Sequence, residues 1–91
     1  VEDVDKSAFT WMMYPNKEAV HGFTVRLQMD EPEPASVLVF NVSGNMVAEK
    51  RVNASGGVGE CDINVPVGGV YIVKLITERS RNEFSGKILV R

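Results

Sequence analysis

Two apolar runs near the end of the chain decide the fold, Gly68-Gly-Val-Tyr-Ile-Val-Lys-Leu-Ile-Thr77 and Phe84-Ser-Gly-Lys-Ile-Leu-Val-Arg91. Both are rich in β-branched and aromatic residues, which are enriched in strands. The charged segment between them, residues 78–83, resembles a turn, so the two runs are predicted to pair as antiparallel strands. The second run finishes at Arg91, and we therefore expect the end of the chain to be an ordered strand, whereas chain ends normally fray.

The rest of the chain repeats this period-two pattern and shows almost no helical periodicity. It is clearest over residues 23–29, where apolar residues alternate with Thr24, Arg26 and Gln28. Strands are also predicted over residues 8–14, 36–42, 46–52 and 59–65. We expect segment 36–42 to be a central strand covered on both sides, and segment 46–52 to be its more exposed hairpin partner across a turn at Gly44. About seven short strands separated by Gly, Pro and Asn predict an all-β, two-sheet sandwich.

Size and charge limit the classes of function. The chain has 91 residues, which is enough for one domain, and 44% hydrophobic and 24% charged residues are ordinary for a globular protein. A net charge of −2 gives no electrostatic footprint for nucleic acid, so no nucleic-acid partner is predicted. Residues 1–7 are acidic and are predicted to be a linker to an upstream domain, with the folded domain over residues 8–91. Because the chain begins with Val1, we expect it to be part of a longer precursor.

The sequence is poor in groups for catalysis or metal binding. Cys61 is alone, and its alternation with Ile63 predicts a buried, inert thiol. His21 is the single histidine and is expected in an exposed turn. The carboxylates of segment 30–34 are interrupted by two prolines, which favours a solvated turn over a metal loop. No catalytic residue, metal or cofactor is predicted, and the protein is not expected to be an enzyme.

The cluster Trp11, Met12, Met13 and Tyr14 allows two interpretations. Successive residues of a strand point to opposite faces, so Trp11 with Met13 and Met12 with Tyr14 cannot all enter one core. Either one pair fills the core of the sandwich, or an exposed apolar stripe docks to another domain.

Three segments, in this order, resemble the C-terminal sorting domain of type IX secretion cargo in Bacteroidota. Tyr14-Pro15-Asn16 followed by Phe23-Thr-Val25 is similar to the family's opening Tyr-Pro-Asn-Pro motif, with Lys17 where the family has its second proline. Val37-Leu-Val-Phe-Asn-Val-Ser-Gly44-Asn-Met-Val47 is similar to the middle motif, an apolar strand turning on a glycine. Gly69-Val-Tyr-Ile-Val73 with Lys87-Ile-Leu-Val-Arg91 is similar to the final motif.

The resemblance implies an immunoglobulin-like antiparallel β-sandwich that directs a folded cargo through an outer-membrane translocon. It implies transit through the periplasm, then release or attachment at the cell surface. In such proteins a sortase-like peptidase often removes the domain, which would place the cut in or before residues 1–8. The expected partners are therefore the type IX translocon, the peptidase and an upstream cargo domain. Pairing between the edge strands of two copies would also allow a homodimer.

The resemblance assigns recognition to the closing hairpin and a structural role to the earlier motifs. The expected residues of translocon recognition are Gly69, Tyr71, Lys87, Ile88, Leu89, Val90 and Arg91, and the expected structural motif residues are Tyr14, Pro15, Asn16 and Gly44. The alternative is an adhesive or carbohydrate- or protein-binding sandwich whose last strand is purely structural. That alternative predicts a flat platform of exposed aromatic side chains from Trp11, Tyr14 or Tyr71.

Overall fold

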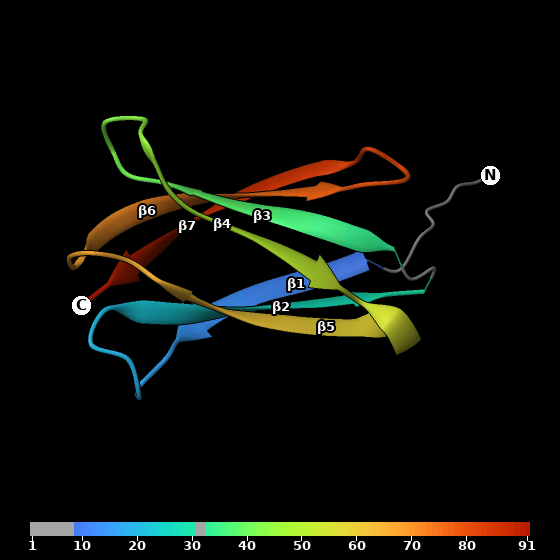
Figure 1. Ribbon diagram of the computed structural model, residues 1–91, viewed down its shortest axis with the longest axis horizontal. Coiled ribbons are helices and arrows are strands. Elements are labelled where there is room, and N and C mark those ends of the chain that lie inside the picture. Colours follow the sequence, from blue (N-terminus) through green and yellow to red (C-terminus); the bar gives the residue numbers. More distant parts are fainter. Residues whose placement is uncertain (1–8, 31–32) are drawn as a thin grey trace.

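The computed structural model describes residues 9–30 and 33–91, and the predicted linker over residues 1–7 lies outside them (Figure 1). The strands are β1 (Phe9–Pro15), β2 (Gly22–Met29), β3 (Pro34–Phe40), β4 (Met46–Asn53), β5 (Val58–Asn64), β6 (Gly69–Thr77) and β7 (Glu83–Val90), and a 3-10 helix, η1 (Ser55–Gly57), precedes β5. No helix within the described ranges is long and apolar enough to cross a bilayer.

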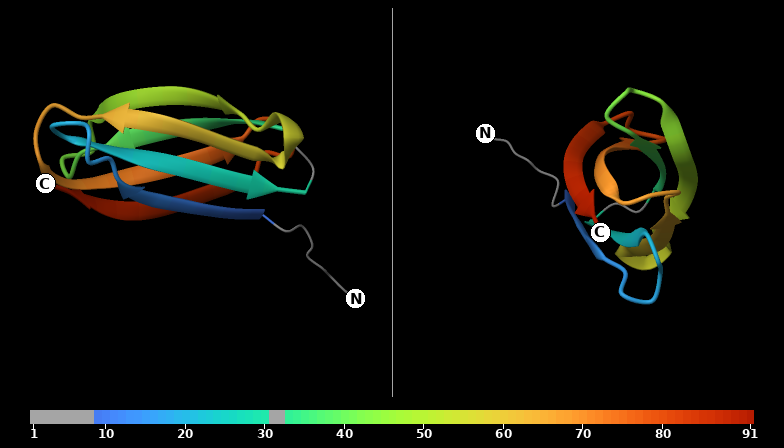
Figure 2. Two further views of the ribbon diagram at one scale, coloured as in Figure 1. Left: turned by 90° about the horizontal axis from the view of Figure 1, so that it is seen from below. Right: turned by 90° about the vertical axis from the view of Figure 1, so that its left-hand side faces the viewer.

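The seven strands form two packed sheets, which confirms the predicted all-β sandwich (Figure 2). One sheet has the order β1-β2-β5 and the other the order β4-β3-β6-β7, and every pair of neighbours is antiparallel. An immunoglobulin constant domain groups its first, second, fourth and fifth strands in one sheet. Here the fourth strand instead pairs with the third, so β4 belongs to the other sheet. The predicted hairpins β3–β4 and β6–β7 are both present.

The core lies between the sheets and follows the predicted alternation except at Thr24, which is buried and donates a hydrogen bond to Asp62 at 2.7 Å. The apolar side chains of β2 point inward, while Arg26 and Gln28 are exposed. The apolar residues without any exposed surface are Phe23, Val25, Leu27, Ala35, Val37, Val39, Ala54, Val73 and Leu75. Burying one large apolar side chain contributes about 1.5–3 kcal/mol. Both sheets supply such residues, so their contact holds the domain together.

Strand β1 closes one side of the sandwich against β7 (Figure 2). The rings of Phe9 and Phe84 stack with centroids 4.4 Å apart. A Cβ atom on Gly86 would lie 3.1 Å from Met13 Cε and 3.2 Å from Trp11 Cη2, so glycine at this position makes room for these two side chains. Trp11 and Met13 thus pack against the core, whereas Met12 and Tyr14 are exposed. Of the two interpretations of this cluster, the core packing holds for the first pair.

Two predictions about the third strand are wrong. The strand runs over Pro34–Phe40 and not over residues 36–42, because the side chain of Asn41 accepts hydrogen bonds from the loop that follows and ends the strand. The proline is tolerated because it is the first residue of the strand. In addition, β3 is central in its sheet but covered on one face only, since Leu38 and Phe40 on the outer face are half-exposed.

The end of the sandwich at which β1 begins is held by polar contacts. The Glu33 carboxylate accepts hydrogen bonds from the Arg79 amide (2.7 Å), the Ser80 amide (2.9 Å) and the Ser80 hydroxyl (2.7 Å). Nearby, the Arg51 guanidinium donates two hydrogen bonds to Glu78, at 2.7 and 3.0 Å. These contacts tie the turn between β6 and β7 to the start of β3 and to β4.

The Glu33 contacts predict that the domain loses stability in acid. Desolvation raises the pKa of Glu33, but the hydrogen bonds donated by Ser80 and Arg79 outweigh it and hold the pKa below its ordinary value. The stabilisation is therefore complete above the pKa of the unfolded chain and is lost as the pH falls through the lower pKa of the folded state. We expect the free energy of unfolding, measured with urea, to fall between about pH 6 and pH 3. Glu33→Gln should show a flatter dependence over this range, and an unchanged pH dependence in that variant would contradict the assignment.

Candidate functional site

The three motif segments, far apart in the sequence, meet at one end of the sandwich. The β1–β2 loop (residues 16–21), the β3–β4 loop (residues 41–45) and the end of β7 all lie at the left of Figure 1, opposite the point at which β1 begins. Antiparallel pairing produces this arrangement, because β1, β3, β5 and β7 all run toward this end. Two hollows open there, and each contains residues of the motif segments.

The β1–β2 loop is shaped by Asn16. Its side-chain oxygen accepts the Glu18 amide at 3.0 Å and its main-chain oxygen accepts the Ala19 amide at 3.2 Å. Its own amide donates to Gly22 O at 3.2 Å, which closes the loop. Asparagine favours such turns because its side chain can bond to nearby backbone. The loop is therefore closed by Asn16 with Lys17, and not proline, as the next residue.

His21 joins this loop to the last residue of the chain. Its Nδ1 atom lies 3.0 Å from Arg91 O, and since a carbonyl oxygen can only accept, Nδ1 must carry the proton. The main-chain oxygen of His21 also accepts the Val65 amide at 3.0 Å. His21 lies in the predicted loop, but its side chain is half-buried and not fully exposed. The contact spans 70 positions, and no local sequence pattern could have indicated it.

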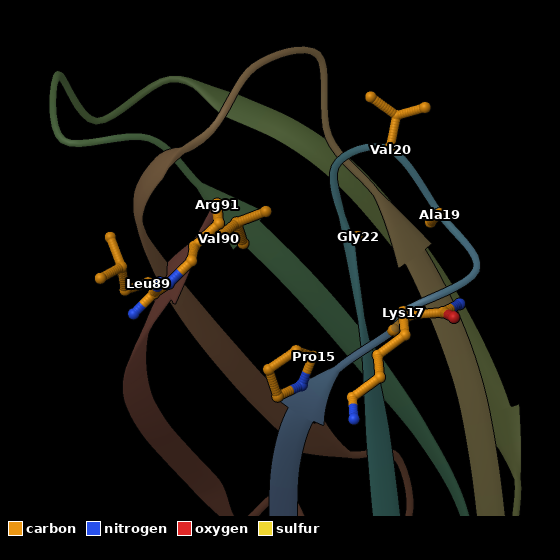
Figure 3. Close-up of a pocket in the computed structure, with 9 residues that line it drawn as sticks. Pro15, Lys17, Ala19, Val20, Gly22, Leu89, Val90 and Arg91 are labelled. Atoms are coloured by element: carbon orange, nitrogen blue, oxygen red, sulfur yellow. The ribbon is translucent and has the colours of Figure 1, made fainter.

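The first hollow, here called the terminal hollow, lies between this loop and the end of β7 and has a volume of about 240 Å³ (Figure 3). It is lined by Pro15, Asn16, Lys17, Ala19, Val20, Gly22, Leu89, Val90 and Arg91. Val20 is 87% exposed and Leu89 is 59% exposed, so apolar groups stand free at its rim. Its charged lining residues, Lys17 and Arg91, are both cations.

The residues predicted for recognition divide into two groups. Lys87 and Leu89 are exposed on the outer face of the four-stranded sheet, and Arg91, directly after the end of β7, is exposed as well. By contrast, Val90 is buried and Ile88 is half-buried against the core. Their side chains face inward, so they support the strand, while the exposed group is available to a partner.

The predicted residues on β6 also have supporting positions. Tyr71 is only 3% exposed, and its hydroxyl donates a hydrogen bond to Val67 O at 2.6 Å. Gly69 pairs with Val90 and has a φ of 153°, a value that favours glycine. Gly68 approaches the same strand end closely, because a Cβ atom there would lie 3.0 Å from Val90 O. Tyr71 therefore cannot offer its ring to a partner while the core is intact.

The second hollow, here called the sheet hollow, lies at the β3–β4 loop and has a volume of about 300 Å³. It is lined by Phe40, Asn41, Val42, Gly44, Ile72 and Lys74. Gly44 has the positive φ that its turn position predicts, at 88°. Asn41 builds the loop by accepting the Ser43 and Asn45 amides, each at 3.0 Å. The Lys74 ammonium lies 5.8 Å from the centre of the Phe40 ring, within the range of a cation–π contact.

Sequence reasoning identified Gly44 but not the other residues of the sheet hollow. Phe40 and Asn41 belong to a predicted strand and to the middle motif without a role in a site, and Lys74 is one charged residue in an apolar run. The alternation in residues 68–77 places Ile72 and Lys74 together on the face of the strand that points away from the core. This alternation is the sequence signal for their outward position. What it cannot show is that β3 and β6 are neighbours, which brings Ile72 beside Phe40.

Catalytic and metal chemistry find little support in residues 9–30 and 33–91, where no group of three or more His, Cys, Asp or Glu side chains could hold a metal ion. Cys61 is half-buried, and burial raises the pKa of its thiol, which keeps it in the poorly nucleophilic protonated form. The aromatic platform of the adhesive alternative is also missing among these residues. Trp11 packs on the core, Tyr71 is buried, and Tyr14 donates its hydroxyl to Glu60 at 2.8 Å.

Comparison with protein families gives a match over most of the chain. The model described as "Secretion system C-terminal sorting domain" matches residues 12–91, which include all three motif segments and both hollows. A search of curated proteins finds no match.

Proposed function

The chain belongs to the family of secretion system C-terminal sorting domains, and we propose that the type IX translocon reads it at the end of the sandwich where β7 finishes. The domain is a sorting signal for type IX secretion, and it directs export through the outer membrane to the cell surface or the medium. It therefore interacts with the type IX secretion machinery, and the family is not known for catalysis. The observation that supports the proposed reading site is the meeting of the first and last motif segments at the terminal hollow.

Recognition there would require little ordering of the chain. The last residues are held by pairing with β6, by the hydrogen bond to His21 and by close contact with Gly68. A strand that already has its bound shape loses little conformational entropy on docking. Leu89 and Arg91 would contact the translocon directly, with Lys87 further along the same face. Gly69, Tyr71, Ile88 and Val90 would position them.

The same reading assigns roles to the rest of the precursor. Residues 1–7 would connect an upstream cargo domain, and the cargo would pass through the periplasm before crossing the outer membrane. A sortase-like peptidase would then cut in or before residues 1–8. A homodimer could form by pairing of two β7 strands, since β7 is at the edge of its sheet. Sedimentation of the purified domain would detect such a dimer.

The test is fusion of residues 1–91 to a fluorescent protein that is exported to the periplasm of a type IX-competent bacterium. We expect fluorescence at the surface or in the medium, and its loss in a translocon mutant. A decrease of about 10 kDa in the size of the exported protein, roughly the mass of the chain, would reveal peptidase removal. A folded fusion that stays in the periplasm of the competent strain would contradict the proposal, and glycan or partner binding by the isolated domain would then support the adhesive alternative.

A further inference from the structure

Exposed apolar side chains gather at the end of the sandwich that carries the two hollows. Nine large hydrophobic side chains are exposed among the described residues, and besides Tyr14 near the end of β1 six of them are at this end. They are Val20, Val42, Met46, Val67, Val70 and Leu89. They come from three loops and the adjoining strand ends, so no single stretch of sequence reveals the group. Exposed apolar side chains that gather in this way mark interaction sites in soluble proteins.

The two hollows are connected across the outer face of the four-stranded sheet. Leu89 lines the terminal hollow and lies directly opposite Val70 in the β6–β7 register. Ile72 follows Val70 on the same face of β6 and lines the sheet hollow. The Val70–Leu89 pair therefore forms an apolar bridge between the hollows, and the whole can be contacted by one partner.

The charged side chains that line the two hollows have one sign. Lys17 and Arg91 line the terminal hollow and Lys74 lines the sheet hollow, while no Asp or Glu side chain lines either. Lys87 lies opposite Ile72 on the same face. The chain as a whole carries a net charge of −2, so these cations stand out against its average charge. Complementary charge favours a partner that carries carboxylates.

The cargo side of the domain is elsewhere. The described chain enters β1 at Phe9, at the opposite end of the sandwich, where the contacts of Glu33 and Arg51 hold the loops (Figure 1). A domain joined before β1 therefore attaches away from the hollows.

We propose that the terminal hollow, the Val70–Leu89 pair and the sheet hollow form one docking surface for a protein of the type IX machinery that presents apolar side chains beside carboxylates. This inference rests on the proposed function and extends it, because it adds the β3–β4 loop, Ile72 and Lys74 to a recognition site expected in the closing hairpin at Gly69, Tyr71 and residues 87–91. The partner's apolar groups occupy the hollows, and its carboxylates face Lys17, Arg91 and Lys74.

The test uses the fluorescent fusion with three substitutions outside the last strand. Val20→Asp and Val42→Asp place a carboxylate at the rim of each hollow, and Lys74→Glu reverses the charge of the sheet hollow. We expect each to lower the extracellular fraction about tenfold, as for a central interface residue. Lys74→Arg keeps the charge and should retain export. Val58→Asp, at an exposed valine of the opposite end, is the matched control and should also be exported normally.

The outcomes separate this inference from the proposed function. The unfolding midpoint of each purified variant is compared with that of the parent domain. Equal midpoints show that the variant is folded and that its loss of export comes from a changed surface. The inference would be overturned if Val42→Asp and Lys74→Glu were exported normally under conditions in which export of the fusion depends on residues 87–91. That result would leave the proposed function intact. Loss of a dimer without loss of export would assign the surface to a second copy of the chain and would also overturn it. A parent fusion that is never exported would instead contradict the proposed function.

Discussion

Replacing Phe23 with alanine is expected to lower the free energy of unfolding by about 3–5 kcal/mol. Phe23 has no exposed surface and is among the largest fully buried side chains of the domain, so its truncation leaves a cavity between the sheets. A domain of this length has a total stability of roughly 5–14 kcal/mol. The variant should therefore be marginally folded, which urea denaturation of the purified domain would measure as a lower midpoint with an unchanged slope.

The matched control is Val42→Ala, which removes a similar kind of group from a loop. Val42 is 73% exposed, so its truncation should change the free energy of unfolding by less than about 0.5 kcal/mol. If Phe23→Ala cost no more than this control, the assignment of Phe23 to the core would be wrong.

The behaviour of β2 shows why most of the fold was predictable. A strand with one buried face must alternate, and the four apolar residues of segment 23–29 leave a single register that buries them. The two hairpins were predictable for a similar reason, because their turn residues are local signals. Asn41 shows the limit of this reasoning. It stands within an apolar run, yet its short side chain bonds to two amides of the following loop and ends the strand.

The residues of β4 do not by themselves specify its sheet, and its pairing with β3 was predicted from the turn at Gly44 instead. Its Glu49, Lys50 and Arg51 predict an exposed strand, and they are exposed, but an edge position exists in either sheet. Which sheet receives the strand depends on the short β3–β4 loop, which keeps β4 beside β3. Residue patterns describe which face of a strand is buried, whereas strand order depends on contacts between distant segments.

The residues of the candidate site that were expected to contact a partner were predicted only in the closing hairpin, although the structural motif residues Pro15, Asn16 and Gly44 also line the hollows. Leu89 and Arg91 were identified from their alternation and from the family resemblance, and both are exposed at the terminal hollow. The sequence predicts only an exposed turn position for His21, because its hydrogen-bond partner, Arg91, is 70 positions away. The sequence gives no role for Lys74, because its position over the Phe40 ring depends on the pairing of β3 with β6.

Ending the chain at Gly86 is expected to abolish export of the fluorescent fusion, with the precursor accumulating in the periplasm. The deletion removes Lys87, Leu89 and Arg91 from the outer face and half of the β6–β7 pairing. It also removes Val90, which is buried, so loss of export by this variant alone could reflect unfolding. The deletion therefore needs a companion that changes only the exposed group.

The double variant Leu89→Asp with Arg91→Glu is that companion. Both side chains point away from the core, so the free energy of unfolding should change by less than about 0.5 kcal/mol for each substitution. The hydrogen bond between His21 and the main chain of Arg91 does not involve the Arg91 side chain and should persist. We expect the extracellular fraction to fall at least about tenfold, as expected when an anchor residue of an interface is lost. Normal export of the folded double variant would mean that the last strand serves only to complete the sheet, and that the translocon reads another surface of the domain.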